Sequence, residues 1–183
     1  MKLRKIVSGG QTGVDRAALD VALELGIPSG GWCPKGRVAE DGLIASRYPL
    51  TETSSADYAQ RTERNVRDSD GTLILNRGAY LSGGTAQTRE VALRLRRPCL
   101  VIDLTSSLPS AAILLWLQTR RIGALNVAGP RESKQAGIYG EALRYLREVL
   151  CSLWHPAKPA PSIKQKALQP SSKKSTGIRL SRR

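Results

Sequence analysis

The sequence predicts an α/β protein with a Rossmann-like parallel sheet sandwiched by helices, followed by a disordered basic C-terminal tail. Strand-like apolar segments alternate with segments of helical periodicity over residues 1–154, a pattern typical of a parallel sheet covered on both faces. Beyond residue 154 the apolar periodicity ends, and Pro, Ser and Lys dominate the composition. We therefore expect a Rossmann-like ligand-binding domain over residues 1–154 and a tail over residues 155–183.

Each predicted element follows from a local pattern. Short apolar runs bounded by turn residues predict strands at residues 2–7, 30–33, 71–75, 98–104 and 124–128. Helical spacing of apolar residues, and one polar stretch of helix length, predict helices at residues 12–25, 55–67, 82–96, 111–121 and 138–154. Residues 34–49 are rich in Gly, Pro and charge and predict a long loop. The expected order is β-α-β-loop-α-β-α-β-α-β-α.

The ends of the first helix carry their own signals. Thr12 and Asp15 are three residues apart and resemble a capping box with Asp in place of Glu. Gly26 and Pro28 follow the last apolar residue of the helix and predict its end.

The charge of the chain is unevenly distributed. Lys and Arg number 29 and Asp and Glu number 15, which gives a formal net charge of +14. Residues 155–183 hold eight basic residues and no acidic one, so the 21 basic and 15 acidic residues of positions 1–154 leave a net charge of +6. Eight cations without a carboxylate attract polyanions, and one hypothesis is therefore non-specific nucleic-acid association through the tail. The alternative is a solvated extension.

Composition excludes several classes of protein. No apolar run approaches the roughly 18 residues that a membrane span requires, and a Ser-Gly-Gly turn stands where a signal peptide would continue its apolar stretch. Three widely spaced cysteines, Cys33, Cys99 and Cys151, argue against a disulfide framework or a zinc site and suit a reducing cytosol. The single His155 has no partner for metal ligation. We expect a cytoplasmic protein with no membrane segment and no protein-ligated metal.

Two glycine-rich turns precede predicted helices. Their members are Gly9, Gly10, Gln11, Thr12 and Gly13 in the first turn, and Gly83, Gly84 and Thr85 in the second. Ligands of open parallel sheets bind beyond the carboxyl ends of the strands, and the free N–H groups of a helix N-terminus suit a phosphate. The two turns together predict an anion-binding site, with tight turns that bind nothing as the alternative. Neither the dinucleotide-binding fingerprint nor the P-loop spacing is present.

Charged candidates follow two other predicted strands. Basic and hydroxyl side chains that could hold a phosphate are Lys35 and Arg37, with Gly36 between them, and Arg131 and Ser133. A second hypothesis is a nucleotide or nucleoside hydrolase, in which one carboxylate activates water. The catalytic candidates are Asp15, Glu40, Asp41 and Glu132. A solvated loop with local ion pairs is the alternative for residues 35–42.

These motifs together resemble the putative molybdenum carrier family. The resemblance covers residues 5–150 and rests on residues 9–16, 31–37, 40–42, 82–85 and 125–133. That family is similar to molybdenum cofactor carrier proteins and, more distantly, to the LOG phosphoribohydrolases; all are Rossmann-like and often oligomeric. The resemblance implies a homo-oligomer that binds a small phosphorylated ligand, either a pterin such as the molybdenum cofactor (molybdopterin) or a nucleotide derivative.

One segment departs from the pattern of the LOG phosphoribohydrolases. Their Pro-Gly-Gly-x-Gly-Thr-x-x-Glu segment has an additional glycine, whereas here Thr85 directly follows Gly84 and Glu90 comes five residues after Thr85. The resemblance therefore does not carry nucleotide-hydrolase activity over to this chain.

Overall fold

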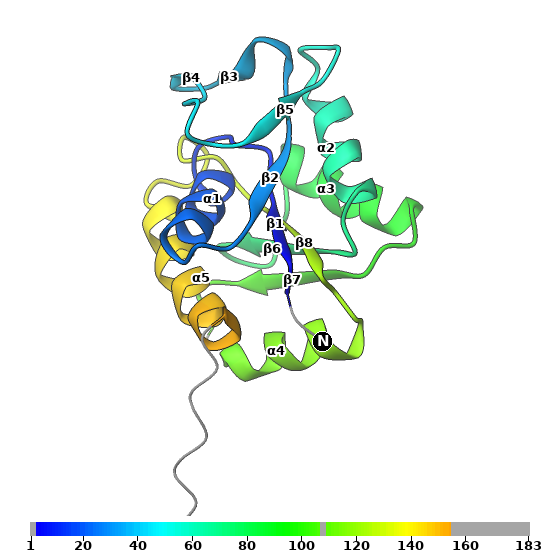
Figure 1. Cartoon of the computed structure of the whole chain (residues 1–183), viewed down its shortest axis with the longest axis vertical. Helices are drawn as coiled ribbons and strands as arrows, with labels where there is room; N and C mark the ends of the chain where they lie inside the picture. The colour runs from blue at the N-terminus through cyan, green and yellow to red at the C-terminus, as the bar shows by residue number, and fades with distance from the viewer. Residues whose placement is uncertain (1–2, 107–108, 155–183) are drawn as a thin grey trace, which may run out of the picture.

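The computed structural model of the protein describes residues 3–106 and 109–154 (Figure 1). The tail expected at residues 155–183 lies outside the described residues. The elements, in chain order, are β1 (Lys5–Val7), α1 (Val14–Glu24), β2 (Ser29–Cys33), the 3₁₀ turn η1 (Lys35–Arg37), β3 (Val38–Ala39), β4 (Gly42–Leu43), β5 (Leu50–Glu52), α2 (Tyr58–Arg67), β6 (Gly71–Asn76), α3 (Gly83–Arg94), β7 (Cys99–Asp103), α4 (Ser110–Thr119), β8 (Ala124–Ala128) and α5 (Ile138–Trp154).

Six strands form one parallel sheet in the order β5-β2-β1-β8-β6-β7. The last strand of the described residues, β8, is thus inserted between β1 and β6, and Lys5 is in register with Ala124. The chain moves outward from β1 to β2 and β5 on one side, and β6 and β7 lie on the other. The carboxyl ends of β1 and β8 flank this change of direction, where open α/β sheets bind their ligands.

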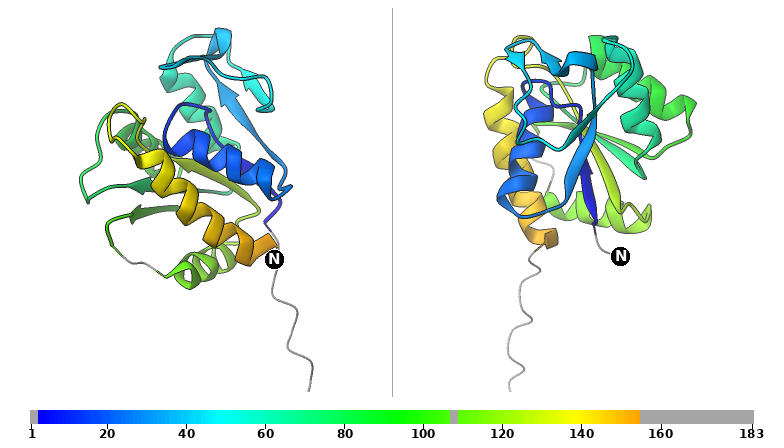
Figure 2. Two further views of the ribbon diagram at one scale, coloured as in Figure 1. Left: turned by 90° about the vertical axis from the view of Figure 1, so that its left-hand side faces the viewer. Right: turned by 45° about the horizontal axis from the view of Figure 1, so that its top comes forward.

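Helices cover both faces of the sheet, which confirms the predicted α/β class. Helices α1, α4 and α5 pack on one face, and α2 and α3 pack on the other (Figures 1 and 2). Alternate strand residues supply the two layers: Leu73 and Leu75 are fully buried against the first group of helices, whereas Thr72 has the opposite orientation. On that face the hydroxyl of Thr72 accepts a hydrogen bond from the side-chain amide of Asn126 at 3.2 Å. Asn126 is buried in β8, and Thr72 is the hydrogen-bond partner that a buried amide requires.

The predicted loop at residues 34–49 is more ordered than expected. It contains η1 and a small antiparallel hairpin, β3 with β4, and it leads into the unpredicted strand β5. β5 is three residues long and pairs in parallel with β2 at the sheet edge. Of its residues only Leu50 is buried, so its sequence shows no run of apolar residues that would predict a strand.

The predicted capping box at Thr12 and Asp15 is wrong. α1 begins after Gly13, and no side chain caps its N-terminus. The hydroxyl of Thr12 donates to Glu40 instead, and Asp15 pairs with Arg61 of α2. Gly13 has a φ of 72°, and a Cβ there would lie 2.3 Å from the carbonyl oxygen of Pro130. The turn is therefore built around close contact with the segment that follows β8.

Candidate functional site

A pocket of about 330 Å³ opens at the carboxyl ends of β1 and β8, between α2 and the N-terminus of α3. We call it the α3 pocket. Its lining comes from the turn after β1, from α1, α2 and α3, and from the segment after β8. The residues are Gln11, Asp15, Tyr58, Arg61, Thr62, Ser82, Gly83, Gly84, Thr85, Gln87, Thr88, Ala128, Gly129, Pro130, Arg131, Lys134 and Gln135.

The α3 pocket is lined by three cationic side chains. Arg61 comes from α2, and Arg131 and Lys134 follow β8. Arg131 stacks over the ring of Tyr58 at 4.6 Å from its centroid, and Arg61 lies 5.7 Å from the same centroid. Tyr58 therefore holds two guanidinium groups beside the pocket through cation–π contacts. Only one carboxylate, Asp15, is among the lining residues.

Arg61 is fixed by a largely buried ion pair. Its Nη1 lies 2.8 Å from Oδ2 of Asp15, and the two side chains are 15% and 5% exposed. The guanidinium lies directly over Gly9, where a Cβ would be 1.5 Å from Nη1. This glycine is therefore required for the close approach of Arg61, and Nε of Arg61 is buried without a hydrogen-bond partner among the described residues.

The N-terminus of α3 presents free donors to the same pocket. Its N-cap, Ser82, makes no side-chain capping hydrogen bond, and a Cβ added to Gly83 or Gly84 would meet nothing within 4 Å. The N–H groups at a helix N-terminus carry partial positive charge and suit an anion. Thr88 does not add a donor here, because its hydroxyl donates at 2.8 Å to the carbonyl of Gly84 in its own helix.

Gln11 contributes an unpaired donor to the lining. The residue is 3% exposed, and its Oε1 accepts hydrogen bonds from the backbone N–H groups of Thr12 at 3.0 Å and Glu40 at 2.9 Å. These two donors fix the orientation of the amide, because only an oxygen can accept them. Its Nε2 is left buried with no partner among the described residues. A buried amide donor without a partner is costly, and a ligand acceptor would remove that cost.

A second, more open pocket of about 620 Å³ lies on the other side of the turn at residues 12–13. We call it the Glu40 pocket. Its lining residues are Thr12, Gly13, Arg16, Asp20, Glu40, Asp41, Arg47, Tyr48, Glu132, Ser133, Tyr139 and Gly140. Three of the four predicted catalytic carboxylates, Glu40, Asp41 and Glu132, are therefore separated from the cations of the α3 pocket.

Each carboxylate in this second group is already engaged. Glu40 accepts hydrogen bonds from the hydroxyls of Thr12 and Ser133; burial alone would raise its pKa, but these bonds hold the pKa below its ordinary value. Asp41 accepts two hydrogen bonds from Arg16, at 2.9 and 3.1 Å, and these bonds lower the pKa of Asp41. Lowered pKa values keep both groups ionised and make them weak proton acceptors.

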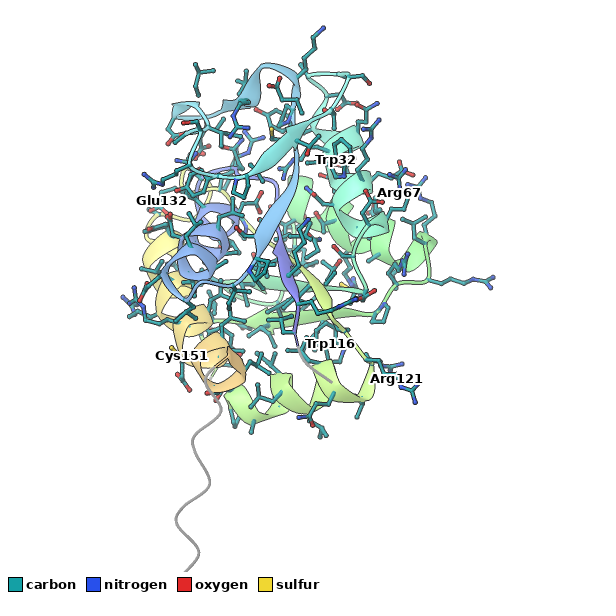
Figure 3. The ribbon with its side chains drawn as sticks, viewed as in Figure 1. Trp32, Arg67, Trp116, Arg121, Glu132 and Cys151 are labelled. Carbon is teal, nitrogen blue, oxygen red and sulfur yellow. The ribbon has the colours of Figure 1, made fainter. Side chains whose placement is uncertain are left out.

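Glu132 binds backbone N–H groups at the start of α5. Its carboxylate accepts hydrogen bonds from the backbone N–H of Gly137 at 2.5 Å and of Tyr139 at 3.0 Å. Figure 3 places the labelled Glu132 on the α1 and α5 side of the molecule, away from α2 and α3. The contacts of Glu132 are those of a carboxylate at a helix N-terminus.

The structure does not bring Lys35, Gly36 and Arg37 into either pocket. Lys35 and Gly36 are exposed. The guanidinium of Arg37 donates to four backbone carbonyls of the loop that precedes and enters β5, namely those of Ile44, Ala45, Tyr48 and Leu50, at 3.0–3.1 Å. The donors of Arg37 therefore hold this loop together, and its expected role toward a ligand phosphate stays a prediction.

The other predicted binding residues are divided between the two pockets or lie beside them. Gln11, Gly83, Gly84, Thr85 and Arg131 line the α3 pocket, and Thr12, Gly13 and Ser133 line the Glu40 pocket. Gly9 lies beneath Arg61. Gly10 has a φ of 75°, and a Cβ there would contact the side chains of Leu50 and Ile44.

Sequence reasoning missed Tyr58, Arg61 and Lys134. Tyr58, Arg61, Thr62 and Asn65 recur at helical spacing along the predicted polar helix, and this periodicity was the available signal. Polar residues at such positions usually indicate a solvated face. Only the packing of α2 beside the glycine turns therefore identifies Tyr58 and Arg61 as part of the site.

Within residues 3–106 and 109–154, no three His, Cys, Asp or Glu side chains are grouped so that they could hold a metal ion. No helix in these residues is both long and apolar enough to cross a membrane.

Comparison with known proteins gives two matches. The family model described as "Circularly permutated YpsA SLOG family" matches residues 6–150. Among solved structures, the chain is similar to a protein named "Putative molybdenum carrier protein" from Syntrophus aciditrophicus SB, with 49% sequence identity and a TM-score of 0.77. That match covers 81% of this chain and 95% of the other. No curated protein matches the chain.

Proposed function

Since the chain belongs to the circularly permuted YpsA SLOG family, we propose that it is a binding protein that holds a small phosphorylated ligand in the α3 pocket. One observation carries this proposal: three cations and an uncapped helix N-terminus converge on one pocket at the carboxyl ends of β1 and β8. Arg61, Arg131 and Lys134 outnumber the single carboxylate there, and Asp15 is itself paired with Arg61.

Different residues of the α3 pocket would contact different parts of the ligand. The N–H groups of Gly83 and Gly84 and the guanidinium of Arg131 would hold the phosphate through charge-assisted hydrogen bonds. Gln11 would donate to an acceptor atom of the ligand from the opposite lining. The similar solved structure from Syntrophus aciditrophicus SB supports the same general role, because that protein is named a putative molybdenum carrier.

The ligand class that we favour is a phosphorylated pterin, such as molybdopterin, or a nucleotide derivative. A volume of about 330 Å³ lies near the lower end of the range of roughly 300–1,000 Å³ typical of ligand pockets, which suits a single ring system with one phosphate group. The donors of the pocket are amide, guanidinium and ammonium groups, which suit phosphate and carbonyl oxygens. We therefore assign no metal ligand to the protein; a metal cargo would be held by the pterin.

The test is a thermal-shift panel of phosphorylated pterins, mononucleotides and inorganic phosphate, combined with native mass spectrometry of the purified protein. Gly84→Asp places a carboxylate at the N-terminus of α3, and Gly84→Ala is the matched control because the added methyl group meets open space. We expect the wild type and Gly84→Ala to be stabilised by the same compounds and Gly84→Asp to lose that stabilisation. Equal shifts in all three proteins, or no shift with any compound, would contradict the proposal.

The hydrolase alternative is examined in the same samples by product analysis. Asp15 is the only candidate carboxylate in the α3 pocket, and its engagement with Arg61 does not favour it as a base. If the wild type converts a nucleotide or nucleoside and Asp15→Asn does not, the protein is an enzyme and the binding role is wrong.

A further inference from the structure

Two arginines that follow helix C-termini adopt a backbone conformation that favours glycine. Arg96 and Arg121 have φ values of 52° and 55°, and they follow α3 and α4. Both helices end in the same hydrogen-bonding pattern as α1, where the corresponding residue is Gly26 with a φ of 66°. A non-glycine residue in this conformation costs roughly 1 kcal/mol or more. The chain therefore carries a charged side chain at two positions where its own first helix uses glycine.

These arginines belong to a group of basic residues that precede the amino ends of four neighbouring strands, β1, β8, β6 and β7. Its members are Arg4, Arg67, Arg96, Arg97, Arg120 and Arg121, and we call it the arginine edge. Arg4 lies over Gly123 before β8 and pairs with Asp70 before β6 at 3.4 Å. Arg97 donates to the backbone carbonyl of Arg67 at 2.9 Å, which joins the ends of α2 and α3. Figure 3 shows Arg67 and Arg121 on the same side of the molecule.

Two carboxylates at this surface each pair with one arginine of the edge and also accept hydrogen bonds from other donors. Asp70 accepts hydrogen bonds from the backbone N–H groups of Gly123 at 3.0 Å and Ala124 at 2.7 Å as well as from Arg4. Asp68 accepts from the indole of Trp32 at 2.8 Å and pairs with Arg67. The other four arginines of the edge are exposed and make no ion pair with any residue in positions 3–106 and 109–154.

We infer that the arginine edge binds the phosphodiester backbone of a nucleic acid, at the end of the sheet opposite the α3 pocket. Guanidinium groups match phosphate oxygens in two-point contacts, and exposed, unpaired ones lose least when they exchange water for phosphate. The basic sequence of residues 155–183 follows α5, whose C-terminal end also lies toward this end of the molecule (Figure 1). The strain at Arg96 and Arg121 is then the cost of placing charge where a helix C-terminus would otherwise carry glycine.

The test uses the chain of residues 1–183 and relieves the backbone strain at Arg96 and Arg121. The double variant Arg96→Gly/Arg121→Gly removes two charges while allowing the backbone its preferred residue, so we expect the Tm to stay equal or rise. Binding to fluorescent duplex DNA and single-stranded RNA is measured over a series of salt concentrations. We expect the slope of log K against log salt to become shallower by about 1.8 for the duplex and about 1.4 for the single strand.

The matched control is Lys35→Gln/Arg144→Gln, which removes the same charge from exposed positions outside the edge. Its slope should equal that of the wild type. A third protein has all eight basic residues of positions 155–183 changed to Gln, and its residual binding should still weaken when Arg96→Gly/Arg121→Gly is added. An unchanged slope in Arg96→Gly/Arg121→Gly would overturn the inference, as would retention by anionic lipid vesicles but not by nucleic acid. A lower Tm with unchanged binding would assign the arginines to helix capping instead.

Discussion

Gln11 illustrates how a single side chain can join two parts of the site. Its oxygen accepts the N–H groups of Thr12 and Glu40, and so ties the turn after β1 to the segment between β3 and β4. The same two bonds fix the amide so that its NH₂ group has no partner within residues 3–106 and 109–154. Under the proposed function this donor would bind an acceptor atom of the ligand, because the two bonds to the oxygen keep the amide from rotating.

Replacing Gln11 by Glu should separate these two roles. The carboxylate still accepts from Thr12 and Glu40, but the donor becomes an acceptor, so we expect ligand affinity to fall at least tenfold, consistent with the loss of about 1.5–3 kcal/mol for a hydrogen bond to a charged group. Isothermal titration with the ligand identified in the panel measures this. Gln87→Glu adds the same charge elsewhere in the pocket lining. If both variants lose affinity equally, general repulsion and not the Gln11 donor is responsible.

Glu40 should make a pH-dependent contribution to stability. Its pKa in the folded protein lies below the ordinary value of 4.5, because the hydrogen bonds from Ser133 and Thr12 outweigh the effect of burial. A lowered pKa stabilises the fold above the unfolded value, and this stabilisation is lost as the pH falls through the folded value.

We therefore expect Glu40→Gln to lower the free energy of unfolding near neutral pH, by less than about 1 kcal/mol because the residue is exposed. The difference should shrink as the pH falls below 4.5 and through the folded value, as measured by urea unfolding at several pH values. Glu90→Gln removes a charge from an exposed position with no hydrogen-bond partner among the described residues, and it is the control. A deficit of equal size at every pH would rule out this role for the ionised Glu40.

At the scale of elements, α2 positions much of the cationic lining. It is anchored to β2 by Asn65, whose side chain donates to the carbonyl of Trp32 at 3.0 Å and accepts from its N–H at 2.7 Å. The amide thus pairs with the strand as a neighbouring backbone would. One helical face then presents Tyr58 and Arg61 to the α3 pocket.

Asn65→Ala should loosen this helix. The substitution leaves both main-chain groups of Trp32 without their partner, and we expect a loss of about 2–4 kcal/mol in the free energy of unfolding. Ligand affinity should fall as well, because Arg61 and Tyr58 move with α2. Glu63→Ala, on the solvent side of the same helix, should cost below about 1 kcal/mol. Urea unfolding and titration of both variants give the comparison; wild-type affinity in Asn65→Ala would show that the anchor does not position the site.

At the scale of the whole molecule, two groups of cations in the described residues differ in their surroundings. In the α3 pocket Arg61 is held by Asp15 and Tyr58, and Arg131 by Tyr58, whereas the cations of the arginine edge are exposed at the opposite end of the strands. The total of +14 therefore describes neither site. Ligand binding at the first should depend weakly on salt, and nucleic-acid binding at the second should depend on it strongly.

The homo-oligomer implied by the family resemblance stays a prediction. Leu43 and Tyr80 are 77% and 84% exposed, the highest values among the large hydrophobic side chains of the described residues. We expect light scattering after size-exclusion chromatography to give a multiple of 19.8 kDa, with Leu43→Ser or Tyr80→Ser shifting the distribution toward the single chain. A mass of 19.8 kDa at every concentration would contradict the prediction.

Much of the fold could be predicted from the sequence because its signals are local. The strand at residues 71–75 and the helix at residues 138–154 follow from uninterrupted apolar runs and helical spacing, and the structure has β6 and α5 there. β5 could not be predicted in this way. Its three residues become a strand only by pairing with β2, and that pairing joins segments almost 20 residues apart.

What the sequence by itself determined is the alternation of strands and helices and the two glycine-rich turns, since hydrophobic periodicity and backbone freedom belong to each segment separately. Which side chains share a pocket was decided by the tertiary structure alone. Arg37 and Arg61 are both arginines near a predicted strand end or helix, yet one ties a loop together and the other lines the α3 pocket. The insertion of β8 between β1 and β6 brings Arg131 to the same pocket, because strand order, unlike strand formation, depends on contacts between residues far apart in the chain.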